Sequence, residues 1–174
     1  MGNKRNHPVW EVYDLRRTCR LNVKYWSAKL IRLRRKNFWL EYMLMATAPS
    51  SAIAGFVFWS TTYGKTAWSI LITITAALAV AKPLLKLSDG LDKLQKVVTQ
   101  YKSVEYQIEA LGNDIRREDE YSYTMVNTYK NLADQIREIS DDEPIESTDQ
   151  DLRKSCYEEV NEELPLTYFY EPSK

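Results

Sequence analysis

The residues best placed to do chemistry in this sequence are small and hydroxyl-bearing side chains that recur every four positions inside two uncharged stretches. The second stretch contains the set Ser69, Thr73, Ala77 and Ala81, and the first contains the set Thr47, Ser51 and Gly55. Small side chains at this spacing let membrane helices approach closely, and their hydroxyls form interhelical hydrogen bonds. They predict helix packing within one hairpin or, once several hairpins assemble, a polar path lined by Ser69, Thr73 and Thr75.

Sequence motifs for catalysis are absent. There is no glycine-rich phosphate loop, no nucleophile elbow and no zinc-binding histidine pair, and the lone histidine, His7, lies next to Pro8 near the N-terminus. The acidic run Asp114, Glu118, Asp119 and Glu120 is typical of a solvated helix surface. The spacing of Cys19 and Cys156 matches no metal or redox pattern, so both are expected to be ordinary reduced thiols. We therefore expect no enzyme activity, no cofactor and no metal.

The elements that must position the small residues are two apolar helices. Residues 42–64 are 23 positions without a charge, and residues 66–81 are another 16, with Lys65 between them. A membrane-spanning helix needs about 20 apolar residues. The sequence predicts a transmembrane hairpin over residues 40–85, with spans at about 40–61 and 66–85. The alternative is a buried helix pair in a soluble bundle, which the serine and threonine content and the mean hydropathy of −0.47 favour; a signal peptide fits less well.

Pro49 lies inside the first predicted span and is expected to act as a hinge. A proline in a helix frees a backbone carbonyl and can kink the helix, and Ser50 and Ser51 are close enough in sequence to satisfy the freed group. No charged residue lies at the middle of either span. This argues against a proton relay or an ion-coupled transporter.

The charges of the chain are segregated by position, although 24 basic and 24 acidic residues cancel overall. Residues 1–41 contain 11 basic and 3 acidic residues, and residues 82–174 contain 12 basic and 21 acidic residues. Lysines and arginines flank both predicted spans, which places both termini in the cytoplasm by the positive-inside rule. We therefore expect a multi-pass protein of the cell inner membrane, with Phe38, Trp39 and Tyr42 at the inner interface.

Residues 1–39 are interpreted as a basic amphipathic cytoplasmic helix. Its expected apolar face consists of Leu15, Cys19, Asn22, Trp26, Leu30 and Leu33. We expect the first half of this helix to pack against another cytoplasmic helix. The basic residues expected at the membrane surface are Arg32, Arg34, Arg35 and Lys36. Nucleic acid is not expected as a partner, because no binding fold or aromatic platform accompanies the charge.

Residues 86–140 carry the pattern of cytoplasmic coiled-coil-like helices. The first apolar seam is Leu84, Leu87, Leu91, Leu94, Val98 and Tyr101, and the second is Met125, Tyr129, Leu132, Ile136 and Ile139. The register is expected to slip near Val104 and Glu105. The polar run 116–120 is either a solvated helix surface or a turn that reverses the chain into a helical hairpin and allows a three-helix bundle.

Residues 141–174 form an acidic tail with 11 acidic and 3 basic residues, expected to be partly disordered. A short helix is predicted within residues 153–164, followed by the aromatic residues Tyr168, Phe169 and Tyr170. The tail is interpreted as a frayed terminus, a docking segment for a partner, or a segment that folds back on the basic N-terminal helix. The predicted fold class is therefore all-α: a membrane protein with a two-helix transmembrane hairpin and a cytoplasmic helical bundle or coiled coil.

The order of parts resembles the SLATT family, two-transmembrane effectors associated with nucleotide second-messenger synthetases and nucleotide-sensing domains in prokaryotic defence systems. The resemblance lies in the basic run TCRLNVKYWSAKLIRLRRKNFW, the short two-span hairpin and the long helix KPLLKLSDGLDKLQKVV, and it covers about residues 10–140. It implies an effector that oligomerises and permeabilises the inner membrane when an upstream sensor or nucleotide signal activates it. It implies no catalytic residues.

The expected partners follow from this interpretation: membrane lipid, further copies of the chain in a homo-oligomer, and a sensor or signal-synthesising protein. A second hypothesis explains the same features with a different class of protein. In it, the chain is a non-enzymatic membrane-anchored adaptor or scaffold that recruits partners through its coiled coil and acidic tail.

Overall fold

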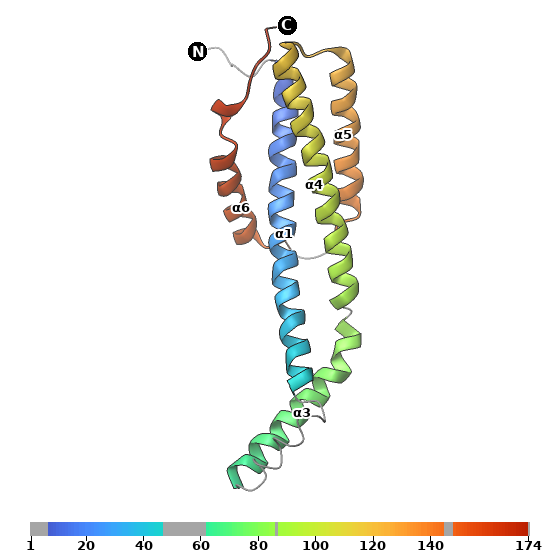
Figure 1. Ribbon diagram of the computed structural model, residues 1–174, viewed down its shortest axis with the longest axis vertical. Helices are drawn as coiled ribbons and strands as arrows, with labels where there is room; N and C mark the ends of the chain where they lie inside the picture. The colour runs from blue at the N-terminus through green and yellow to red at the C-terminus, as the bar shows by residue number, and fades with distance from the viewer. Residues whose placement is uncertain (1–6, 47–61, 86, 145–147, 174) are drawn as a thin grey trace. The chain divides into compact units, whose positions relative to one another are not determined.

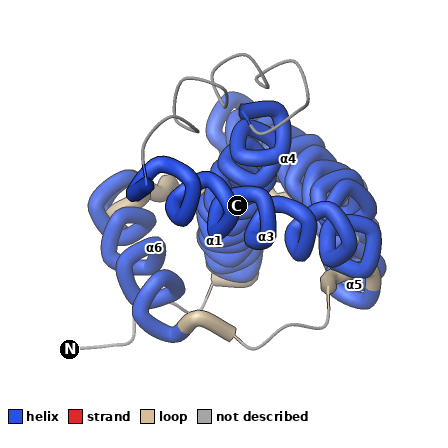
Figure 2. The backbone as a smooth tube through the Cα atoms, turned by 90° about the horizontal axis from the view of Figure 1, so that it is seen from below, coloured by secondary structure: helices blue, strands red, loops and turns tan. Residues whose placement is uncertain are grey.

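The computed structural model describes residues 7–46, 62–85, 87–144 and 148–173 (Figure 1). The elements are α1 (Val9–Ala46), α3 (Thr62–Leu85), α4 (Leu87–Glu118), α5 (Tyr123–Asp141), α6 (Gln150–Glu163) and the 3-10 turn η2 (Leu166–Tyr168). Within these residues every regular element is helical, and Figure 2 shows helices joined by turns without a strand. The predicted all-α class is confirmed.

The chain divides into two compact units. The first, called the bundle below, consists of the described residues of Met1–Lys29 and Lys93–Lys174. The second, called the apolar unit, consists of the described residues of Leu30–Asp92. Helices α1 and α4 each contribute residues to both units.

Helix α4 supplies the longest strip of the core of the bundle. Its buried residues are Leu94, Val97, Val98, Tyr101, Val104, Ile108, Leu111 and Ile115. Apart from the adjacent pair Val97 and Val98, they recur every three or four positions, which keeps one face of an α-helix against its neighbours. Near Val104, where the register is expected to slip, the buried residues Val98, Tyr101 and Val104 follow at two successive spacings of three instead of three and then four.

The polar run at residues 116–120 reverses the chain. Helix α4 ends at Glu118, and the next residue, Asp119, has a φ of 51°, the left-handed conformation in which helices commonly terminate. Helix α5 then begins at Tyr123. The ion pair between Lys96 and Asp142, at 3.1 Å, joins the first part of α4 to the end of α5. The two helices are therefore antiparallel, and of the two alternatives the helical hairpin is the one observed (Figure 1).

Helix α1 buries a different arc from the predicted one. Its buried residues in the bundle are Val9, Val12, Tyr13, Cys19, Val23, Tyr25 and Trp26. Cys19, Trp26 and Leu30 of the predicted face are buried, whereas Leu15, Asn22 and Leu33 are only half-buried. The apolar arc is rotated towards Val12 and Val23 because α1 contacts both α4 and α6, and two neighbours cover more of a helix than one.

Helix α6 begins at Gln150. Its N-cap is Asp149, whose carboxylate accepts a hydrogen bond from the backbone N–H of Leu152 at 3.0 Å. Such a cap satisfies one of the unpaired N–H groups of the first turn. The buried side chains of Cys156 and Val160 face the bundle. The predicted helix within residues 153–164 is thus observed as Gln150–Glu163, lying beside α1 (Figure 1).

Candidate functional site

Helix α3 exposes apolar side chains around its circumference. Its segment Tyr63–Val80 is 18 residues long, has a mean hydropathy of 1.3 and is only 6% buried. Ile70, Ile72 and Ile74 are all exposed, and because successive residues turn by about 100°, Ile70 and Ile72 point to nearly opposite sides. Among the residues that the structure describes, this is the one helix long and apolar enough to cross a membrane.

The first predicted span lies largely outside the described residues. Thr47, Ser51 and Gly55 of its small-residue stripe, together with the predicted hinge Pro49, fall within residues 47–61. The part of the predicted span that is described, residues 40–46, forms the last turns of α1, where Tyr42 and Met45 are exposed. The two-span hairpin is therefore not confirmed, and a single candidate span stands.

The small-residue stripe of the second predicted span lies on α3. Ser69, Thr73 and Ala77 are exposed, and Ala81 belongs to the same helix. The hydroxyl of Thr73 donates to the backbone carbonyl of Ser69, and the hydroxyl of Thr75 donates to that of Leu71, both at 2.8 Å. These intrahelical bonds satisfy the hydroxyl donors, which lets both threonines face an apolar medium.

The last turns of α1 combine exposed basic and exposed aromatic side chains. The four predicted surface residues Arg32, Arg34, Arg35 and Lys36 are all exposed. They are followed by Phe38, Trp39 and Tyr42, of which Phe38 and Tyr42 stack with ring centroids 6.4 Å apart. All three rings are more than half exposed. Basic residues followed by amphipathic aromatic rings are typical of the boundary between headgroups and hydrocarbon.

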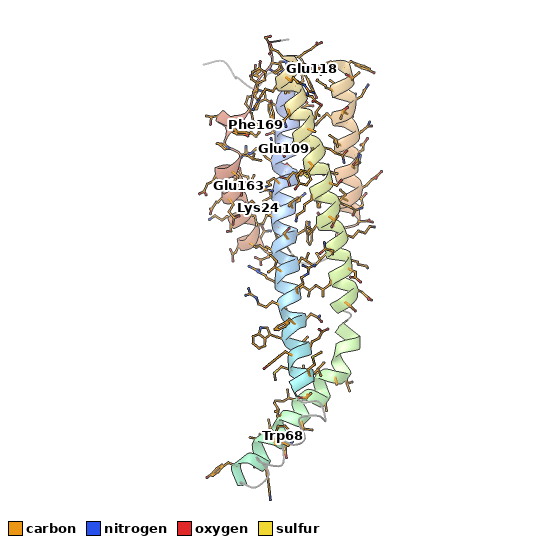
Figure 3. All side chains as sticks on the ribbon, in the orientation of Figure 1. Lys24, Trp68, Glu109, Glu118, Glu163 and Phe169 are labelled. Atoms are coloured by element: carbon orange, nitrogen blue, oxygen red, sulfur yellow. The ribbon has the colours of Figure 1, made fainter. Side chains whose placement is uncertain are left out.

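In the bundle, the basic side of α1 is matched by carboxylates of α4 and α6. The basic ladder consists of Arg16, Arg17, Arg20 and Lys24. The ion pairs are Arg16 Nη2 with Glu109 Oε1 at 2.7 Å, Arg20 Nη1 with Glu105 Oε1 at 3.1 Å, Arg20 Nε with Glu163 Oε2 at 2.9 Å, and Lys24 Nζ with Glu159 Oε2 and Glu163 Oε1, both at 2.7 Å. Figure 3 labels Lys24, Glu109 and Glu163 on their three helices. The acidic tail thus folds back on the basic helix, one of the three expected arrangements.

These contacts shift the protonation equilibria of the paired groups. The hydrogen bond from Lys24 is the main reason that the pKa of the Glu163 carboxyl lies below its ordinary value. Burial lowers the pKa of Lys24, but hydrogen bonds to Glu159 and Glu163 outweigh it, so the pKa of Lys24 is raised overall. Both shifts favour the charged forms.

A single carboxylate at the end of α5 ties three parts of the bundle together. Oε1 of Glu143 accepts a hydrogen bond from Nε1 of Trp26 and another from the hydroxyl of Tyr101, both at 2.7 Å. Burial, followed by the hydrogen bond to Glu143, raises the pKa of Tyr101. Further along the chain, the backbone N–H of Asp149 donates to the hydroxyl of Tyr25 at 3.1 Å. The connection from α5 to α6 is therefore anchored to α1 on both sides.

The aromatic C-terminus packs against the first turns of α1. The ring of Phe169 stacks on that of Tyr13 with centroids 4.4 Å apart and lies edge-on to Trp10 at 6.3 Å. The hydroxyl of Tyr13 donates to the backbone carbonyl of Tyr170, and the indole Nε1 of Trp10 donates to Glu171 at 3.2 Å. The C-terminal segment therefore follows α1 from Tyr25 back to its N-terminal turn.

Asp119, which follows α4 in a left-handed backbone conformation, binds the last described residues of the chain. The carboxylate of Asp119 accepts hydrogen bonds from the hydroxyls of Tyr170 and Ser173 and, at 3.0 Å, from the backbone N–H of Ser173. Arg116 adds a hydrogen bond to the carbonyl of Tyr168 at 3.2 Å. The acidic cluster that contains Asp119 thus has a structural partner. Within the described residues, no group of three or more His, Cys, Asp or Glu is placed to hold a metal ion.

Both cysteines are buried free thiols. The Sγ of Cys19 donates to the backbone carbonyl of Tyr101 at 3.3 Å. Burial raises its pKa to about 12, with the charge of Glu105 adding to the shift. A thiol this far from ionisation is a poor nucleophile and a poor metal ligand, in agreement with its interpretation as an ordinary thiol.

The sequence did not reveal the residues that fasten the tail to α1. In the sequence, Glu143 is one of 11 acidic residues in the tail, and no pattern marks Trp10 or Tyr13 as a contact. A signal was present in the alternation of charge, because the spacing of Arg16, Arg20 and Lys24 matches that of Glu159 and Glu163 on a helix.

Comparison of the chain with protein-family models, with curated proteins and with solved structures finds no match.

Proposed function

We propose that the protein is a non-enzymatic membrane effector that oligomerises and permeabilises the cell inner membrane when an upstream sensor or nucleotide signal activates it. The observation that carries the proposal is the exposure of Tyr63–Val80, of which only 6% is buried. A helix that is apolar all round needs an apolar medium on every side. Lipid provides that medium, and 18 residues at 1.5 Å each cover about 27 Å of a hydrocarbon core of about 30 Å.

The flanking residues support a position across the bilayer. The exposed set Arg32, Arg34, Arg35 and Lys36 precedes the exposed rings of Phe38, Trp39 and Tyr42, and Lys93 and Lys96 follow α3 in the sequence. With a first span at about 40–61, both sets of basic residues lie on the cytoplasmic side. In this arrangement Tyr63 and Lys65 lie at the outer surface, and the bundle is cytoplasmic.

The proposed pore is built from several copies of the hairpin. Ser69, Thr73 and Ala77 form an exposed stripe on α3, which suits close helix approach between subunits. A stripe of this kind lines a path when α3 helices from several copies face one central axis. The bundle is the part of the chain available to a sensor or signal-synthesising partner.

A membrane-anchored adaptor is the second candidate function. One observation favours it: the hydroxyls of Thr73 and Thr75 donate to their own helix, so neither is held towards a neighbouring subunit. In an adaptor, α3 only tethers the bundle, and its stripe packs within one hairpin.

Reconstitution into liposomes separates the two functions. We expect the full-length protein to release a trapped dye as the protein-to-lipid ratio rises, and Thr73→Leu and Ala77→Leu to reduce the release at equal insertion. Ile72→Leu, which keeps an apolar side chain off the stripe, is the matched control and should behave as wild type. Inserted oligomers that release no dye, and do not dissipate membrane potential when expressed, favour the adaptor. A stable monomer in detergent contradicts the pore.

A further inference from the structure

Arg17 is the exception among the four cations of the basic ladder. Arg16, Arg20 and Lys24 each have a carboxylate oxygen within 3.1 Å. The Nη2 of Arg17 instead donates to the amide oxygen of Asn161, which carries no charge. Its Nε is shielded from solvent and has no hydrogen-bond partner in the described part of the chain. Among the described residues, the positive charge of Arg17 therefore lacks the ionic partner that its neighbours have.

Arg17 lines a groove between α1 and α6. The groove has a volume of about 520 Å³, within the range of about 300–1,000 Å³ that small-molecule sites occupy. Asp14, Arg17 and Leu21 line it from α1, and Tyr157, Asn161 and Leu166 line it from α6 and η2. The three α1 residues are spaced three and four apart and share one helix face. The groove thus combines the cation of Arg17 and the carboxylate of Asp14 with apolar and aromatic walls.

We propose that this groove binds a small organic anion. Its phosphate or carboxylate group would accept hydrogen bonds from the guanidinium of Arg17, whose planar fork suits such groups. Its apolar or aromatic body would lie against Leu21, Leu166 and the ring of Tyr157, which is 53% exposed. The guanidinium charge of Arg17, which has no ion pair in the described part of the chain, supplies the polar part of the recognition.

Asp14 sets a limit on the ligand. Its carboxylate lines the same groove and repels a bound anion, so it weakens the affinity for any anion that Arg17 attracts. A ligand seated here contacts both α1 and α6. It therefore strengthens the attachment of the C-terminal segment to α1, whether or not the protein permeabilises membranes.

The test is calorimetric titration of the full-length protein in detergent micelles with phenyl phosphate, inorganic phosphate and benzylamine. We expect saturable binding of phenyl phosphate, weaker binding of inorganic phosphate, which lacks the aromatic body, and none of the cation benzylamine. Arg17→Gln should lower the affinity for phenyl phosphate by roughly tenfold or more, as expected for loss of a charge-assisted contact. Asp14→Asn should raise it by removing repulsion.

Lys102→Gln is the matched control. It removes one positive charge from an exposed position of α4 outside the groove and should leave the affinity unchanged. Arg17→Lys, which keeps the charge and loses the fork, should bind with intermediate affinity and guards against a folding defect in Arg17→Gln, together with circular dichroism melts of each variant. No saturable binding of phenyl phosphate overturns the proposal. Equal losses in Arg17→Gln and Lys102→Gln also overturn it, because they indicate diffuse charge attraction.

Discussion

The indole Nε1 of Trp26 donates a hydrogen bond to Oε1 of Glu143 at 2.7 Å, across 117 positions of sequence. The same oxygen accepts from the hydroxyl of Tyr101. The side chains of both donors are buried. One carboxylate therefore joins α1, α4 and the end of α5 at the point where the chain turns towards α6.

Removing this carboxylate should destabilise the bundle. We expect Glu143→Ala to cost roughly 1–3 kcal/mol of unfolding free energy, because two buried donors lose a charged acceptor. Glu143→Gln keeps an acceptor and should cost less. The midpoint of thermal unfolding, followed by circular dichroism, measures both. Equal stability of wild type and Glu143→Ala contradicts this role.

The stack of Phe169 on Tyr13 should fasten the C-terminus to α1. We expect Phe169→Ala to cost roughly 1–2 kcal/mol, since it removes an aromatic pair and buried apolar area. Its effect should also appear as faster hydrogen exchange in α6. Tyr123→Ala is the control, because that ring is 77% exposed and its loss should change stability by less than about 0.5 kcal/mol. Indistinguishable effects of the two substitutions refute the anchor.

The ion pairs of Lys24 should give the attachment of α6 a salt dependence. Lys24→Gln is expected to cost roughly 0.5–1 kcal/mol at low ionic strength, and 1 M salt should remove most of the difference because partly exposed pairs are screened. Melting curves at the two salt concentrations measure it, with Lys102→Gln as the control, because Lys102 is exposed and forms no ion pair with the residues that the structure describes. A cost for Lys24→Gln that salt leaves unchanged points to packing of its aliphatic stem instead.

The lowered pKa of Glu163 predicts how the attachment of α6 to α1 responds to acid. Its pKa is lowered in the folded protein, mainly by the hydrogen bond from Lys24. The stability that it contributes is therefore present above the unfolded pKa of about 4.3 and is lost as the pH falls through the lower folded value. Glu163→Gln should flatten the acid limb of a stability-against-pH curve. Superimposable acid limbs contradict the assignment.

Alkaline pH should weaken the bundle through groups that stay protonated when folded. Burial raises the pKa of Cys19 and that of Tyr121 to about 12. Unfolded thiols and phenols ionise near about 8.5 and 10. The stability that the protonated Cys19 and Tyr121 contribute is fully present below these unfolded pKa values, and it is lost as the pH rises towards 12. Denaturant unfolding between pH 8 and 11 measures it, and Cys19→Ala should remove the part that begins near pH 8.5. In the native protein Cys19 should resist thiol reagents at pH 8.

The sequence was most informative where one periodicity determined the structure. The seam of Leu94, Val98 and Tyr101 was predicted from spacing alone, because α4 keeps this face against its neighbours. The prediction of the buried face of α1 from the sequence was wrong in part, because packing against both α4 and α6 rotates the buried arc towards Val12. Local patterns do not encode such long-range pairing, and for the same reason Glu143 was not distinguished from its acidic neighbours.

Only part of the candidate site could be predicted from the sequence. The apolar character of α3 follows from composition, and the predicted second span, at about 66–85, overlaps the one candidate span that the structure describes, Tyr63–Val80. Arg17 could not be singled out from the sequence. It is one of several arginines there, and only the partners of Arg16, Arg20 and Lys24 show that it lacks a carboxylate of its own.

The proposal that α3 crosses a membrane with its flanks on opposite sides can be tested by labelling single cysteines with a membrane-impermeant maleimide. The background is Cys19→Ala with Cys156→Ala, and the probes are Lys65→Cys and Lys93→Cys. In intact cells we expect the reagent to label the Lys65 position alone, and to label the Lys93 position only after permeabilisation. Equal labelling of both positions in intact cells, or labelling of neither until the membrane is opened, contradicts it.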